Sequence, residues 1–342
     1  MLQRLVLVAA LVLCGLTPAK AYTPESGTWW NPAQSGWGIL IEIQDNFLFA
    51  AVYTYEPTGP AIWYTATGFL SGNSRFVGVL DGFRNGPCLS CPGPMPNTFF
   101  PAAGGSITID FDPDDPTRAR LAWGGRTNIP IERYQFYLKR PEDEAAFPGV
   151  RIQLTKMLGE WRSVLDFSEN TSIGYPYYGD IAIFDILDSD NLGDFLDGCR
   201  PDDSLVGVCS STAVRDHRAT MEYNAQDGEH ILVLDNDAST FAAYFLRVGT
   251  NHFEGEVSVY NKGSNPSVFY PVRGYRSASR TFVQGEDGPS KSTQTPARRA
   301  GLPHEPFLGA HAGSAKRLAP DKAATLARLE ARLADTASRE AR

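Results

Sequence analysis

A short tryptophan motif that occurs twice constrains the fold of this chain more than any other feature. Gly27-Thr28-Trp29 opens one run of alternating apolar and polar residues, and Gly159-Glu160-Trp161 opens a second run of similar length. Alternation with a period of two predicts β-strands that are buried on one face. We therefore expect two copies of one β-module, residues 22–141 and 159–276, joined by a linker at residues 142–158. In each copy the tryptophan would plug one end of a closed sheet.

The strand signals are densest in the first module. Trp37 shares a face with three isoleucines in residues 36–43, and Phe47, Phe49, Ala51, Tyr53 and Tyr55 share a side of the next strand. Further strands are expected at residues 61–67, 75–80, 106–111, 119–123 and 131–138, and in the second module at 181–187, 213–223, 230–234, 240–248, 253–260 and 267–275. Short strands joined by turns predict an all-β fold of two tandem antiparallel meander barrels, or two-sheet sandwiches.

The N-terminus has the pattern of an export signal. Arg4 precedes an apolar run at residues 5–13, and Ala19-Lys20-Ala21 matches a small-x-small cleavage site. We expect a signal peptide at residues 1–21 and a mature chain that begins at Tyr22. A lipoprotein attached through Cys14 is the alternative, but Leu13 stands where lipidation needs a small residue. No later segment has about 18 consecutive apolar residues, so no membrane-spanning helix is expected, while an association with the cell envelope stays open.

The cysteines fit an oxidising compartment. Removal of the leader leaves an even set, Cys88, Cys91, Cys199 and Cys209. Two disulfides, each closing a loop, are the natural interpretation. The Cys88–Cys91 spacing also occurs in redox pairs, but the surrounding Gly and Pro residues predict a turn-rich loop without the helix start that lowers a thiol pKa.

Charge and composition separate the folded body from a C-terminal tail. Residues 22–276 carry 18 basic and 32 acidic residues, whereas residues 277–342 carry 11 basic and 7 acidic ones. The acidic body argues against nucleic acid as a partner. Residues 277–319 have too little apolar surface to order themselves and are predicted to be disordered. From Pro320 onward a helix is expected, with Leu326, Leu329 and Leu333 on one face. Because this stripe is thin, we expect a solvated helix, with docking on the body or on a partner as the alternative.

Two resemblances follow from these residues. The stretch Gly27-Thr28-Trp29-Trp30-Asn31-Pro32-Ala33-Gln34-Ser35-Gly36-Trp37-Gly38, with Trp63-Tyr64 and the Cys-x-x-Cys loop, resembles a repeat of secreted or surface proteins of Gram-negative bacteria. That resemblance implies export, to the periplasm or the medium, and a β-fold, without implying a reaction. The second module departs from the motif, since Arg162-Ser163-Val164 stands where Trp-Asn-Pro would follow.

The Gly-x-Trp start also resembles the first strand of lipocalin and avidin barrels, whose last strand supplies a basic residue that stacks on this tryptophan. The resemblance implies that Trp29 meets Lys139 or Arg140, and that Trp161 meets Arg273 or Arg276.

An aromatic surplus in the first module is the best clue to function. Aromatic faces bind sugars and small apolar molecules, and polar neighbours can orient them. The candidate ligand-binding residues are Trp30, Asn31, Ser35, Trp37, Tyr53, Tyr55, Trp63 and Tyr64. The leading hypothesis is a non-catalytic binding module for a glycan or small apolar ligand that uses the aromatic end of the first barrel. A merely aromatic-rich core is the structural alternative.

Signatures of catalysis and of cofactor binding are missing from the sequence. The sequence lacks three common signatures, which are Gly-x-Ser-x-Gly, His-Glu-x-x-His and a glycine-rich loop with a following lysine. The acidic residues at 188–194 resemble a calcium loop, but Leu192 and Cys199 stand where calcium ligands are needed, so we expect a turn there. No catalytic residue, metal or cofactor is therefore predicted. An extracellular hydrolase, or an accessory domain of one, built around His217, His230 or His252 remains the second hypothesis, and a structural surface protein remains the third.

Overall fold

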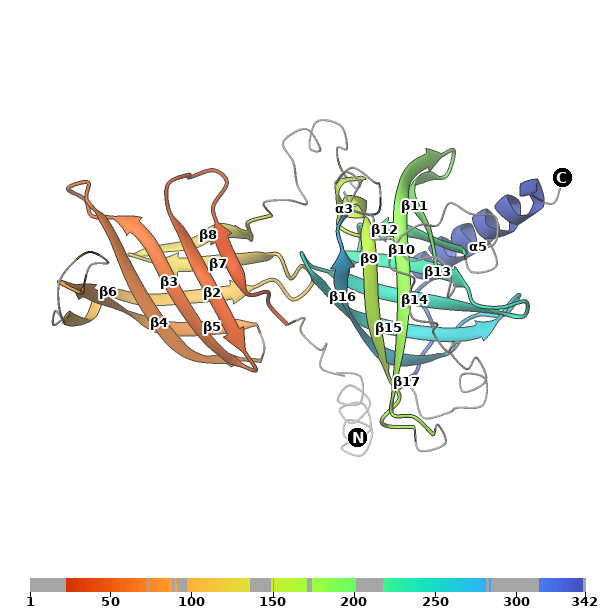
Figure 1. The fold of residues 1–342 in the computed structure, drawn as a ribbon, viewed down its shortest axis with the longest axis horizontal. Coiled ribbons are helices and arrows are strands. Elements are labelled where there is room, and N and C mark those ends of the chain that lie inside the picture. Colours follow the sequence, from red (N-terminus) through yellow and green to blue (C-terminus); the bar gives the residue numbers. More distant parts are fainter. Residues whose placement is uncertain are drawn as a thin grey trace, which may run out of the picture.

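The computed structural model describes residues 23–72, 74–87, 90, 97–135, 149, 151–170, 174–200, 218–280, 283 and 314–340. Several predicted features lie outside these ranges: the signal peptide, Cys88, Cys91, Cys209, Lys139, Arg140, His217 and most of the tail. Within them, two antiparallel barrels contain nearly all of the regular structure (Figure 1).

Barrel 1 is a closed meander of eight strands. Each strand pairs with the next along the chain, and the last pairs back with the first. The strands are β1 (Gly27–Trp30), β2 (Gly38–Gln44), β3 (Phe47–Tyr55), β4 (Ala61–Ser71), β5 (Arg75–Arg84), β6 (Thr98–Phe111), β7 (Arg118–Trp123) and β8 (Arg126–Arg133).

Barrel 2 repeats this order. Its strands are β9 (Gly159–Asp166), β10 (Tyr177–Asp190), β11 (Gly193–Cys199), β12 (Arg218–Asn224), β13 (Glu229–Asp235), β14 (Thr240–Val248), β15 (His252–Asn261) and β16 (Val268–Ala278). β16 pairs with both β15 and β9, which closes the barrel. The predicted pair of tandem meander barrels is therefore confirmed, and the sandwich alternative is excluded because both sheets close on themselves.

The two tryptophans of the repeat occupy equivalent places. Trp29 and Trp161 are buried, and the indole Nε1 of each donates to the carbonyl oxygen four residues earlier, that of Glu25 at 3.1 Å and that of Met157 at 2.9 Å. In the last strand of each barrel an arginine lies directly opposite, Arg133 in β8 and Arg276 in β16. The tryptophans thus anchor corresponding ends of the two barrels.

These arginines bind the chain that enters each barrel. Arg276 lies over the Trp161 ring at 4.2 Å and donates to the carbonyl oxygens of Leu158 and Lys156. Arg133 donates to the carbonyl oxygens of Ser26 and Thr28. The guanidinium group suits this role because its several donors satisfy more than one backbone carbonyl at once.

The barrels contact each other at their tryptophan ends. Glu25, just before β1, is 3% exposed, and its carboxylate accepts from the backbone amide of Thr250 at 2.5 Å and lies 3.3 Å from Nδ1 of His252. A side chain at Gly249 would collide with this carboxylate, because a Cβ there would lie 2.0 Å from Glu25 Oε1. Arg247 adds an ion pair to Asp114 of barrel 1 at 3.4 Å.

Helix α5 (Pro320–Glu340) packs on the outer wall of barrel 2. Leu326, Leu329 and Leu333 are at most 6% exposed and lie against apolar side chains of β13 to β16. The expectation of a solvated helix is therefore wrong, because the wall supplies apolar surface that the helix pattern alone does not reveal. Within the described residues, no helix is long and apolar enough to cross a membrane.

Two predicted linkers are partly structured. Helix α3 (Arg151–Thr155) lies in the predicted linker, just before β9. In the tail, β16 continues to Ala278, and the two residues of β17 (Ser314–Ala315) pair with the start of β16. Disorder was predicted across residues 277–319. Residues 277–278 and 314–315 instead have strand structure, because their backbone groups pair with strands of barrel 2.

Candidate functional site

Four aromatic side chains form a row across the outside of barrel 1, which we call the aromatic row. Tyr53 of β3 lies opposite Trp63 of β4, and Phe83 of β5 lies opposite Phe99 of β6. The Trp63 and Phe83 rings stack, with centroids 5.3 Å apart and planes 13° apart, and the Phe83 and Phe99 centroids are 5.5 Å apart. Successive strands are about 4.8 Å apart, so the row spans about 14 Å.

The row is accessible to solvent. Tyr53, Trp63 and Phe99 are 52%, 44% and 53% exposed. Large aromatic side chains of this exposure are unusual for a barrel surface, where outward positions are normally polar. The row lies away from the Trp29 end, near the turn between β3 and β4.

Polar groups flank the row. Arg84 follows Phe83 and donates to Glu56 at 2.7 Å, and its guanidinium lies 5.5 Å from the Phe100 ring centroid. Exposed rings next to an exposed ion pair give a surface with flat apolar faces and charged hydrogen-bonding groups at one edge. A ligand with one apolar face and several hydroxyl groups fits this combination.

Alternation sorts the predicted aromatic residues onto two faces of barrel 1. Tyr53, Tyr55 and Trp63 point outward, whereas Tyr64 points inward and packs edge-on against Trp123 at 6.1 Å. Trp37 is partly buried against the same core. The structure therefore brings Tyr53 and Trp63 together in the row and assigns Trp37 and Tyr64 to the packing of the barrel interior.

The remaining candidates lie on the strand and loop that follow the first glycine. Trp30 packs edge-on against Tyr134 at 5.0 Å, on a strand that does not neighbour β3 or β4. Asn31 is buried and its side-chain oxygen accepts from the backbone amide of Ala33 at 3.0 Å. Ser35 is exposed, and a Cβ on its neighbour Gly36 would lie 3.7 Å from the Tyr55 ring. Trp30 and Asn31 are therefore separate from the aromatic row.

A pocket of about 540 Å³ lies beside Asn31, on the outside of β6 to β8. Its lining includes Pro32, Pro113, Pro130 and the charged side chains of Asp110 and Arg118. Both charges are paired across the surface, Asp110 with Arg75 at 3.0 Å and Arg118 with Asp115 at 3.3 Å. Asp112, Arg120 and Glu132 also line this pocket, but its one aromatic residue, Phe111, is buried, so the pocket lacks the exposed rings that the row offers.

Two members of the row, Phe83 and Phe99, were missed from the sequence. The expected strand ended at residue 80, yet β5 continues to Arg84 and β6 begins at Thr98. The alternation of Val77 and Val79 continues to Phe83, which was the available signal. Phe99 gave no such signal, because an irregularity in β6 opposite Leu80 and Gly82 interrupts its pattern.

The far end of barrel 2 contains a buried ion pair that the sequence did not predict. Arg200 donates to both carboxylate oxygens of Asp180, at 2.9 and 2.8 Å, and to Asn236 at 2.9 Å, while the Tyr244 hydroxyl donates to Asp180 at 2.8 Å. Burial alone would lower the pKa of Arg200, but Asp180 raises it above its usual value. Burial also raises the pKa of Tyr244. The four side chains satisfy one another's hydrogen bonds and thereby connect β10 and β14 with the ends of β11 and β13.

The histidines of the hydrolase hypothesis are separate in the described residues. His230 is buried beside α3, where its Nε2 donates to the Gln153 carbonyl oxygen at 2.9 Å. His252 lies at the junction with Glu25, and Glu254 pairs with Arg273 at 3.6 Å. In the part of the chain that the structure describes, no group of three His, Cys, Asp or Glu side chains is arranged to hold a metal. Cys199 is buried at the end of β11, and its pairing with Cys209 stays a prediction.

Comparison with known proteins gives little further information. No protein-family profile matches the sequence, and no curated protein matches it. A crystal structure of a DUF3598-family protein of unknown function from Nostoc punctiforme matches with 10% sequence identity and a TM-score of 0.21, covering 73% of this chain and 94% of that one. Similarity at this level assigns neither a ligand nor a reaction.

Proposed function

We propose that this protein is a non-catalytic binding module that recognises a glycan through the aromatic row of barrel 1. The observation that carries the proposal is the stacked pair Trp63 and Phe83 with Tyr53 and Phe99 beside it, all on one solvent-facing row. Sugar rings present apolar C–H faces, which pack on aromatic rings, and hydroxyl edges, which hydrogen bond to flanking polar groups. Glu56 and Arg84 are placed at the edge of the row to supply such bonds.

A glycan fits better than a small apolar ligand held inside the barrel. The interior of barrel 1 is packed from the Trp29 end by side chains such as Ile39, Leu48, Phe76 and Ile109, each at most 1% exposed. Close packing of this kind leaves little room for a guest without a large rearrangement. The exposed outer row binds without such a change.

We also propose that the protein is exported to the periplasm or the medium of a Gram-negative cell, where glycans of the envelope are accessible. The supporting features are the N-terminal leader pattern and the even set of remaining cysteines. Mass spectrometry of the exported chain is expected to give an N-terminus at Tyr22.

The binding proposal is tested by titrating the full chain with a panel of soluble oligosaccharides while tryptophan fluorescence is recorded. A binding sugar is expected to change the emission, and Trp63→Ala is expected to weaken its affinity about tenfold or more, since one exposed ring face is lost. Phe83→Ala is expected to have a smaller effect, because Phe83 mainly supports the Trp63 ring.

Trp30→Ala is the matched control, because Trp30 is also partly exposed but lies on β1, outside the row. The Trp30→Ala variant should bind the sugar with the same affinity as the parent protein. A panel in which no sugar changes the emission, or a sugar whose binding depends on Trp30 and not on Trp63, would show that the row is not the glycan site.

A further inference from the structure

A second part of the barrel 1 surface is apolar where a solvated barrel would be polar. Phe47 and Phe49 of β3, Phe69 of β4, and Val77 and Val79 of β5 point outward and are between 38% and 68% exposed. We call these five residues the β3–β5 wall. Strands that are apolar on both faces are typical of a sheet that another element covers.

The chain itself covers the corresponding wall of barrel 2. Because β4 and β5 are the fourth and fifth strands of their barrel, they correspond to β12 and β13, and α5 packs on these two strands. The outward residues Ile231 and Val233 of β13, the counterparts of Val77 and Val79, are fully buried by the leucine stripe of α5. Figure 1 shows α5 beside barrel 2 only.

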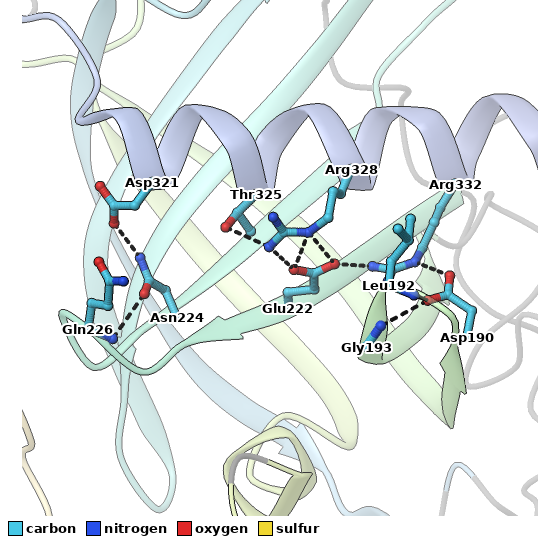
Figure 2. A network of polar contacts seen from close by, with 10 residues as sticks. All are labelled: Asp190, Leu192, Gly193, Glu222, Asn224, Gln226, Asp321, Thr325, Arg328 and Arg332. Carbon is cyan, nitrogen blue, oxygen red and sulfur yellow. Dashed lines mark hydrogen bonds and ion pairs between the residues drawn. The ribbon is translucent and has the colours of Figure 1, made fainter.

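Charge contributes to the way α5 is held. Glu222 of β12 accepts from Arg328 at 2.6 Å and also pairs with Arg332, whose guanidinium binds Asp190 at 2.7 Å (Figure 2). The hydrogen bond from Arg332 lowers the pKa of Asp190 to about 2. Acidic groups on the wall therefore meet basic groups on the helix.

The β3–β5 wall has acidic neighbours of the same kind. Glu42 of β2 is exposed and lies opposite Phe49, and Asp81 of β5 lies opposite Thr65 in the middle of the wall strands. In the described part of the chain, neither carboxylate pairs with a lysine, arginine or histidine. Among the same described residues, Asp81 accepts a hydrogen bond only from the backbone amide of Ala102.

We propose that the β3–β5 wall is the docking site for an amphipathic helix of a partner protein, with a leucine stripe flanked by arginine and lysine. The wall supplies the apolar surface, and Glu42 and Asp81 supply acidic contacts for the basic flank. The occupant that we propose is a helix of another protein, because among the described residues the leucine stripe of α5 is already buried on barrel 2. Phe47 and Phe69 are six residues along their strands from Tyr53 and Trp63, about 20 Å away, whereas Asp81 is two residues from Phe83, so the wall and the aromatic row are neighbouring surfaces on the same strands.

The test uses a fluorescently labelled peptide of residues 320–340 as the helix probe, titrated with the full chain and followed by anisotropy. The chain is expected to bind this peptide, and to bind it about tenfold or more weakly after Phe69→Lys or Val77→Lys, since each change removes apolar contact and repels the basic flank. Both side chains point into solvent, so the variants should keep the parent melting temperature. A peptide with serine in place of the three leucines should not bind.

Val164→Lys is the matched control, because Val164 is 44% exposed on β9 of barrel 2, away from the wall. It should bind the peptide as the parent does, and so should Trp63→Ala, which separates this proposal from the glycan site. Absence of peptide binding, or binding that both wall variants leave unchanged, would overturn the proposal. A dimer in sedimentation that Val77→Lys dissociates would also overturn it, by showing that a second copy covers the wall.

Discussion

Among single residues, His230 is the titratable group from whose surroundings we predict how stability depends on pH. It is 2% exposed, its Nε2 donates to the Gln153 carbonyl oxygen, and its Nδ1 has no hydrogen-bond partner among the residues that the structure describes. Burial lowers the pKa of His230 to about 4; the Gln153 carbonyl and Asp115 act in the opposite direction, and Lys156 adds to the lowering. The ring is therefore neutral in the folded protein at neutral pH.

This pKa predicts a loss of stability in acid. The unfolded chain takes up a proton at this histidine below about pH 6.5, while the folded chain resists it down to about pH 4, so the stabilisation is complete above 6.5 and is lost as the pH falls toward 4. The effect is on the order of 3 kcal/mol at most. His230→Gln keeps a donor for Gln153 but does not titrate.

Urea unfolding of the parent and of His230→Gln between pH 7.5 and 4 measures how the free energy of unfolding of each protein depends on pH. The free energy of unfolding of the parent should fall more steeply with decreasing pH than that of His230→Gln. Parallel curves would mean that His230 does not contribute to the acid sensitivity.

Residues of the tryptophan repeat were the most predictable from sequence. The motif identified Trp29 and Trp161 as equivalent, and the lipocalin resemblance included Arg276 among the residues expected to meet Trp161. In barrel 1 the residue opposite Trp29 is Arg133, which lies earlier than the expected Lys139 and Arg140. The strand pairing that selects Arg133 depends on the register of β1 with β8, over a separation of about a hundred residues, and local patterns do not contain it.

At the scale of elements, strands with clear alternation were predictable and those with other signals were not. β3, β14 and β15 follow their expected ranges closely, and β4 runs four residues past its expected end. β11 was missed because Gly193-Asp194 and Asp197-Gly198 read as turn residues. The predicted acidic turn is the tip of the β10–β11 hairpin, where Asp190 accepts from the backbone amides of Leu192 and Gly193. The register of the neighbouring strand overrides weak local propensity there.

The docking of α5 is the element-scale feature that sequence reasoning judged wrongly. Three leucines are too few to predict burial from a helix alone, and the complementary surface lies on strands about a hundred residues earlier. Glu222 is central to this contact, because it is 6% exposed and pairs with both Arg328 and Arg332.

Glu222→Gln is therefore expected to loosen α5. Loss of the carboxylate leaves two arginines with weaker partners, one of them nearly buried, which is costly. Hydrogen exchange followed by mass spectrometry should show amides of residues 322–335 exchanging about tenfold or more faster, with the strands of barrel 1 unaffected. Asp321→Asn is the control, because it changes a contact at the exposed first turn only. Equal exchange in Glu222→Gln and the parent would contradict the role given to this carboxylate.

At the scale of the whole molecule, the two barrels meet at their tryptophan ends, which leaves their opposite ends and outer walls for other contacts. Glu25 connects the two plugs, since its backbone carbonyl accepts from Trp29 and its carboxylate binds the turn whose Thr250 carbonyl accepts from Arg276. The number and type of modules were predictable from the repeat. The junction between the modules was not predictable, because it depends on contacts between residues more than a hundred positions apart.

We infer that barrel 1 binds its ligand on the outer aromatic row and not in its interior. Fluorine NMR of the full chain labelled with 5-fluorotryptophan tests this directly, because the six tryptophans give separate probes and Trp63→Phe assigns the signal of Trp63. Addition of a binding oligosaccharide is predicted to shift the Trp63 resonance and leave those of Trp29 and Trp161 unchanged. A shift of Trp29 or Trp37 without one of Trp63 would contradict the account.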